Sequence, residues 1–138
     1  MNYKLIAYGH SNILATHKTT LEFTKDKEIS KRGNCIVGAN ADFELSKIKE
    51  FIKNSKNNKI LITIETISKI TKIKETILAE INPSFNSDEE LVIRKTDFLS
   101  DRTFAINADK SAFELDRGLI GFLRGNGDNV RVSVENKA

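Results

Sequence analysis

The chain has one cysteine, one proline and no tryptophan among its 138 residues. The lone Cys35 excludes an intramolecular disulfide and supplies at most one ligand to a cysteine-rich zinc site, so its simplest interpretation is a buried thiol. No apolar run approaches the roughly 20 residues that a membrane helix needs, and the first ten residues lack the apolar core of a signal peptide. We therefore expect a cytoplasmic protein that does not associate with membranes.

Length and composition predict one folded domain over residues 1–138, since 39% of the residues are hydrophobic and 30% are charged. The net charge of +3, from 22 basic and 19 acidic residues, is too small to indicate nucleic-acid binding by itself. Residues 1–66 hold 11 basic and 7 acidic residues, and residues 67–138 hold 11 and 12. The basic excess therefore lies in the first half of the chain.

The segment 9–26 holds both histidines of the protein and many hydroxyl groups. Residues 13–24 alternate with period two, which predicts a strand with His17 on its mostly apolar face. Residues 3–8 form another apolar run, and Gly9, His10, Ser11 and Asn12 between the two have turn chemistry. The pattern predicts a hairpin with His10 at its tip and His17 facing the core.

The rest of the first half predicts a strand, a helix and a strand. A short apolar strand over 35–39 ends at Asn-Ala-Asp, residues 40–42, and Asp42 is a suitable N-cap for a helix beginning soon after. Leu45, Ile48, Phe51 and Ile52 then fall on one helical face. The alternating run 60–65 predicts the closing strand.

The second half repeats this order. An apolar strand over 103–106 ends at a second Asn-Ala-Asp, and Asp109 is expected to cap a helix that Gly125 ends. Residues 130–135 alternate like 60–65, residues 76–81 match 5–10, and residues 91–97 resemble 21–26. The spacing of isoleucines over 69–81 also fits a helix, although the repeat and the β-branched content favour a strand.

We therefore predict an α+β fold with an internal duplication, in pseudo-repeats of about 1–66 and 67–138. Each repeat contains strand, strand, strand, helix and strand. The sheet is expected to be mostly antiparallel or barrel-like, with two helices covering it. Gly118 and Gly121 in the second helix allow close packing against the sheet or a partner chain, so a homodimer through this helix is an alternative to a pseudo-twofold monomer.

The leading functional hypothesis is a ligand-binding or scaffold domain with its site near the first hairpin. The residues expected to contact the ligand are His10, His17, Thr19, Thr20, Glu22 and Arg32. The simplest alternative is that His17 is a hydrogen-bonded core residue and that the threonines reflect β-propensity. The pattern names no cofactor.

Two other functional classes stay open. A hydrolase-like enzyme would use His17 as general acid or base, with or without a metal, and the metal-ligand candidates are His10, His17 and Cys35. A nucleic-acid-associated protein would use the lysines of residues 47–59, although the lack of tryptophan and the inward positions of the phenylalanines disfavour base stacking.

Three blocks of the sequence resemble the archaeal family DUF371, a domain of unknown function. They are GHSNILATHKTTLEFTKD (9–26), RGNCIVGANAD (32–42) and VIRKTDFLSDRTFAINADKSAFELDR (92–117). The resemblance implies an archaeal cytosolic protein and assigns no substrate, cofactor or catalytic residue. The family often has a glycine-rich, histidine-containing hairpin in the second half, whereas this chain reads ILAEINPSFNSDEE there, which favours a single site in the first half.

Overall fold

Eight strands, two α-helices and one 3-10 helix make up the computed structural model, which describes residues 2–125 and 128–137. In chain order they are β1 Asn2–Tyr8, β2 Thr20–Thr24, β3 Ile36–Gly38, α1 Leu45–Asn54, β4 Lys59–Thr66, β5 Lys74–Ile81, β6 Glu90–Arg94, β7 Thr103–Ile106, η1 (the 3-10 helix) Ala112–Glu114, α2 Arg117–Leu123 and β8 Asn129–Asn136. The predicted α+β fold class is confirmed. Among the described residues, no helix is long and apolar enough to cross a membrane.

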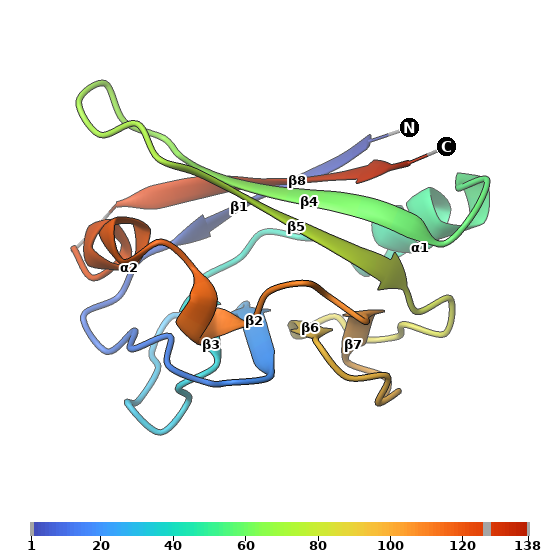
Figure 1. Cartoon of the computed structure of the whole chain (residues 1–138), viewed down its shortest axis with the longest axis horizontal. Helices are drawn as coiled ribbons and strands as arrows, with labels where there is room; N and C mark the ends of the chain where they lie inside the picture. The colour runs from blue at the N-terminus through green and yellow to red at the C-terminus, as the bar shows by residue number, and fades with distance from the viewer. Residues whose placement is uncertain (1, 126–127, 138) are drawn as a thin grey trace.

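The strands form one sheet in the order β1-β8-β4-β5-β7-β6-β2-β3. The pairs β2–β3 and β6–β7 are parallel and the other neighbours are antiparallel. The prediction of a mostly antiparallel sheet is therefore confirmed. In Figure 1 the long strands β1, β8, β4 and β5 lie together as one layer, with the short strands beneath them. The two edges of the sheet meet at a bridge between Tyr8 and Ala39, whose backbones exchange two hydrogen bonds of 2.8 Å.

The hydrophobic core lies between these layers and is supplied by alternating residues of the long strands. Ile60, Ile62 and Ile64 of β4 are buried, and alternate valines of β8 are buried in the same way. Each such side chain contributes roughly 1.5–3 kcal/mol when it is fully removed from water. Period-two alternation in the sequence therefore marked these strands correctly.

The predicted first hairpin is wrong, because β1 pairs with β8 and not with β2. Residues 9–19 form an irregular segment, and β2 begins only at Thr20. The start of this segment is held against the end of α2, where His10 N–H donates to the Leu123 carbonyl at 2.8 Å. A side chain at Gly9 would overlap that same carbonyl group, so glycine permits the close approach that turns the chain away from β1.

The strand order has the symmetry expected of two similar halves. Exchanging the first four strands with the last four reproduces the same cyclic order once the Tyr8–Ala39 bridge joins the edges. The central pairs Glu22–Val92 and Thr63–Ser133 each join residues seventy positions apart. The internal duplication itself stays a prediction, with which this pairing pattern agrees.

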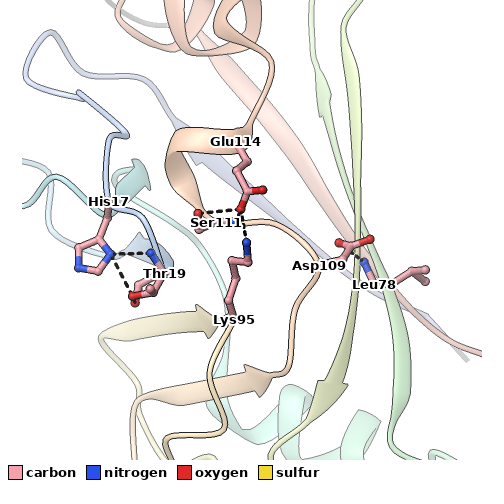
Figure 2. A network of polar contacts seen from close by, with 8 residues as sticks. His17, Thr19, Leu78, Lys95, Asp109, Ser111 and Glu114 are labelled. Carbon is pink, nitrogen blue, oxygen red and sulfur yellow. Dashed lines mark hydrogen bonds and ion pairs between the residues drawn. The ribbon is translucent and has the colours of Figure 1, made fainter.

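The two aspartates of the repeated Asn-Ala-Asp motif do not cap helices, so that prediction is wrong. Asp42 Oδ1 accepts from Ile6 N–H at 2.7 Å, and Asp109 Oδ1 accepts from Leu78 N–H at 3.0 Å (Figure 2). The preceding Asn40 and Asn107 have φ angles of 49° and 52°, a left-handed conformation that asparagine tolerates. Each motif therefore ties the chain to an edge of β1 or β5.

The second helix is shorter than expected. The predicted helix from Asp109 to Gly125 is divided into η1 and α2. Asp116 provides the N-cap of α2, where its Oδ1 accepts from the N–H groups of Gly118 at 2.7 Å and Leu119 at 3.3 Å. In contrast, α1 forms where predicted, but its N-cap residue is Glu44 and no side chain caps it.

Candidate functional site

Two loops of the first half lie side by side and hold most of the predicted site residues. We call residues 9–19 and 26–35 the paired loops. Asn12 Nδ2 donates to the Ile29 carbonyl at 2.8 Å, and the N–H groups of Thr16 and His17 donate to the Asn34 carbonyl at 2.9 and 3.2 Å. Because these contacts occur at both ends of the loops, both histidines lie next to the second loop, residues 26–35.

The first of the paired loops is held in a strained conformation. Ala15 is buried and has a φ of 50°, a left-handed conformation that costs a residue with a Cβ roughly 1–2 kcal/mol. Arg117 of α2 stabilises it, since its guanidinium donates to the carbonyls of Ala15 at 3.1 Å and Ala112 at 2.7 Å. The loop is therefore fixed by tertiary contacts before any ligand arrives.

His10 lies within this loop rather than at a hairpin tip. Its Nδ1 accepts from Asn12 N–H at 3.0 Å, and its Nε2 lies 3.5 Å from a carboxylate oxygen of Glu28. A neutral ring must then carry its proton on Nε2. The His10 side chain is 17% exposed and the Glu28 side chain is 94% exposed, so the carboxylate is the partner that solvent or a ligand can reach.

His17 does not face the core as the alternation predicted, because the segment before Thr20 is not a strand and the ring is half-buried. Its Nδ1 accepts from Thr19 N–H at 3.2 Å, as Figure 2 shows, and the Thr19 hydroxyl lies 3.5 Å from the same nitrogen. The bond from the i+2 N–H matches that of His10. It leaves Nε2 as the donor in the neutral ring.

Thr19 and Thr20 join the first half of the chain to the second. The Thr19 carbonyl accepts from Lys95 N–H at 2.8 Å, and the His17 carbonyl accepts from Phe113 N–H at 3.2 Å. Lys95 Nζ in turn lies 2.7 Å from Glu114 Oε1 (Figure 2). Thr20 is buried at the start of β2, which makes it unsuitable for direct contact with a ligand.

Glu22 is a buried carboxylic acid in the middle of β2, with only 6% of its surface exposed. Burial, followed by the nearby charge of Glu90, raises its pKa to about 7, although Arg102 and the Cys35 thiol act in the opposite direction. The Cys35 Sγ lies 3.7 Å from Glu22 Oε1, and burial together with the Glu22 charge raises the pKa of Cys35 to about 11. This thiol is therefore a poor nucleophile at neutral pH.

The candidate metal ligands lie in different surroundings. Cys35 contacts Glu22, whereas His10 contacts Asn12 and Glu28, and His17 contacts Thr19. Within residues 2–125 and 128–137, no group of three or more His, Cys, Asp or Glu residues is arranged to hold a metal ion. Arg32, the remaining candidate, is exposed in the second paired loop two residues before Asn34.

A hollow of about 320 Å³ lies beside His10. We call it the His10 hollow; its polar lining comes from Tyr8, His10, Ser11, Lys27, Glu28 and Asn40. It joins the end of β1, both paired loops and the first Asn-Ala-Asp motif. Of the predicted ligand-contact residues, only His10 lines it.

Sequence reasoning missed Lys27 and Asn40 as site residues, and it missed Glu90 and Arg102 as neighbours of Glu22. Lys27 lies in a stretch that reads as a charged connection, and Asn40 as part of a strand-to-helix turn. The pairing of Thr24 with Glu90 places Glu90 diagonally across from Glu22, which only strand register reveals. One signal was available, because the asparagine of Asn-Ala-Asp recurs where a left-handed residue is needed.

Comparison with known proteins places this architecture in a family. The model of the family described as domain of unknown function DUF371 matches residues 5–137. This chain belongs to the DUF371 family. An uncharacterized protein of the archaeon Methanocaldococcus jannaschii is 38% identical over 128 residues, which are 90% of this chain and 92% of the relative. The residues matched by the DUF371 model include both paired loops, and the resemblance seen in the sequence is confirmed.

Proposed function

We propose that this DUF371 protein is a binding protein for a small ligand bearing a carboxylate, which it takes up in the His10 hollow. One observation supports this most directly: an exposed carboxylate of the chain itself, that of Glu28, already lies 3.5 Å from His10 Nε2. A ligand carboxylate would replace this exposed side chain at the same nitrogen. In this proposal the Glu28 carboxylate and the ligand carboxylate compete for the same nitrogen of His10.

The chemistry of the hollow suits an anion. His10 Nε2 carries a proton whether the ring is neutral or charged, because Nδ1 is engaged by Asn12 N–H. Lys27 and Ser11 add an ammonium group and a hydroxyl from the two paired loops. Among the described residues, Lys27 makes no ion pair within 4.0 Å. The basic excess of the first half therefore includes a cation that is free to meet a ligand.

Binding is favoured over hydrolysis by the contacts of the second histidine. The Thr19 hydroxyl lies 3.5 Å from His17 Nδ1, which already accepts the Thr19 N–H. That distance and that occupied lone pair do not suit a base activating a hydroxyl nucleophile. The histidines are better explained as fixed donors than as a base with its nucleophile.

Titration with succinate at constant ionic strength, followed by amide NMR of the full chain, tests the proposal. We expect shifts at residues 9–12, 27–29 and 40. His10→Ala should weaken binding by about tenfold, the value of one charge-assisted hydrogen bond. The control His17→Ala should leave the affinity unchanged.

Two further variants address the roles of Lys27 and Glu28. Lys27→Met should weaken binding, whereas Lys31→Met, an exposed lysine of the same loop, should not. Glu28→Gln removes the competing carboxylate and should tighten binding by about two- to fivefold, the range of an exposed ion pair. Equal effects of His10→Ala and His17→Ala, or weaker binding in Glu28→Gln, would refute the proposal.

A further inference from the structure

A second hollow lies away from the paired loops, at the opposite end of the molecule (Figure 1). It has a volume of about 540 Å³ and runs between α1 and the loop after β5. In Figure 1, α1 and this loop are on the right, whereas α2 is on the left. We call it the α1 groove. None of the residues discussed for the His10 hollow lines it.

One wall of the α1 groove is basic. Lys49 and Lys53 are one helical turn apart on α1, so both lie along the same edge of the helix. Neither forms an ion pair within 4.0 Å with a described residue, although the neighbouring Lys47 pairs with Glu44 at 3.4 Å. Ile52, half-buried between them, provides an apolar floor. Because both ammonium groups lack an ion-pair partner among the described residues and line a hollow, they are placed to bind an anion there.

The opposite wall is rigid. Asn82 is 1% exposed, its Nδ2 donates to the Thr103 carbonyl at 2.8 Å, and its Oδ1 accepts from Ser84 N–H at 3.0 Å. Phe85 is buried and packs edge-on against Phe104, with ring centroids 5.6 Å apart. The loop from Asn82 to Phe85 therefore holds its shape without a ligand.

The same wall also contains an amide residue and an acidic residue, Asn86 and Asp101. Asn86 N–H donates to the Asp101 carbonyl at 2.7 Å, so the two segments of this wall are joined by a backbone hydrogen bond, and both residues line the groove. The Asp101 carboxylate makes no ion pair with Lys49 or Lys53 within 4.0 Å. The Asp101 carboxylate therefore lies more than 4.0 Å from both ammonium groups, although all three residues line the same groove.

We propose that the α1 groove binds a sugar phosphate. A phosphate group between Lys49 and Lys53 would be bound by two positively charged ammonium groups. The sugar ring would lie on Ile52, with its hydroxyl groups donating to Asp101 and exchanging hydrogen bonds with Asn86. A simple anion site would not place a carboxylate opposite the lysines, whereas a ligand with an anionic end and a polyhydroxyl end uses both walls.

Ribose 5-phosphate is the probe, compared with ribose, inorganic phosphate and a single-stranded RNA decamer that lacks terminal phosphates. Amide NMR of the full chain should show shifts at residues 49–53, 84–86 and 101 with ribose 5-phosphate. The double variant Lys49→Met, Lys53→Met should lose about tenfold or more in affinity. The matched variant Lys56→Met, an exposed lysine outside the groove, should bind as the wild type does.

Asp101→Asn tests the proposed sugar contact separately from the proposed phosphate contact. This variant should bind inorganic phosphate more tightly, because a negative charge is removed, and it should lose its preference for ribose 5-phosphate over phosphate. Wild-type protein that binds ribose as well as ribose 5-phosphate would overturn the role of the lysines. If RNA perturbs these residues and ribose 5-phosphate does not, the groove is a nucleic-acid surface and the sugar-phosphate proposal fails.

Discussion

Replacing Glu22 by glutamine should stabilise the protein at alkaline pH and not at acidic pH. The native structure raises the pKa of Glu22 from 4.5 to about 7, chiefly because the carboxyl group is buried and then because it lies near the charge of Glu90. The native state thus binds this proton more tightly than the unfolded chain does. The free energy of unfolding should therefore fall as the pH rises from 4.5 to about 7 and then level off.

The size of this effect follows from the pKa interval. Each unit by which the pKa of Glu22 differs between the native and the unfolded state corresponds to roughly 1.4 kcal/mol. Ionised Glu22 therefore lowers the free energy of unfolding by about 3 kcal/mol above neutral pH. Glutamine keeps the shape and cannot ionise. We expect Glu22→Gln to be about 2–3 kcal/mol more stable than the wild type at pH 8 and within about 1 kcal/mol of it at pH 4.

Urea unfolding followed by far-ultraviolet circular dichroism between pH 4 and pH 8 measures this difference. The matched control is Glu89→Gln, because Glu89 is exposed and adjacent in sequence to Glu90. Its difference from the wild type should stay small across the range. A Glu22→Gln difference that does not change with pH, or a variant less stable than the wild type at pH 8, would show that the native pKa of Glu22 is not raised.

Two other substitutions address what holds the loops in place. Asp109→Ala should destabilise the protein by about 0.5–1.5 kcal/mol in urea unfolding, because Leu78 N–H exchanges its acceptor for water. A change as small as that of Asp97→Ala, at another exposed position, would contradict this role. Arg117→Met should speed amide hydrogen exchange at Thr16 and His17, because the Ala15 carbonyl loses its donor and the strained loop is released. Arg124→Met, at an exposed residue of the same region, should leave that exchange unchanged; equal rates in all three proteins would show that Arg117 does not fix the loop.

Several elements could be predicted from the sequence because their signals are local. Alternating isoleucines and valines marked β4 and β8, and the apolar residues spaced along 45–52 marked α1. The competing helical interpretation of 69–81 was resolved in favour of β5, Lys74–Ile81. Here β-branched side chains and the repeat agreed with each other, so local preference and tertiary structure coincide.

The failures share a cause, since each depended on a partner distant in the sequence. The hairpin of residues 3–24 failed because β1 found its partner more than a hundred residues away in β8. Asp42 and Asp109 are residues of the type that caps helices, yet in the folded chain they accept from the N–H groups of Ile6 and Leu78. Composition supplies a hydrogen-bonding group, and packing decides which donor it meets.

The candidate site divides in the same way. The sequence by itself determined that imidazole, hydroxyl and basic groups are concentrated in residues 9–35, because this is a matter of residue identity. Only the tertiary structure decided that His10, Lys27 and Asn40 line one hollow and that the buried Glu22 lies near the charge of Glu90. The physical reason is that charge proximity and burial, which set pKa values and binding, depend on distances in space that no local sequence pattern specifies.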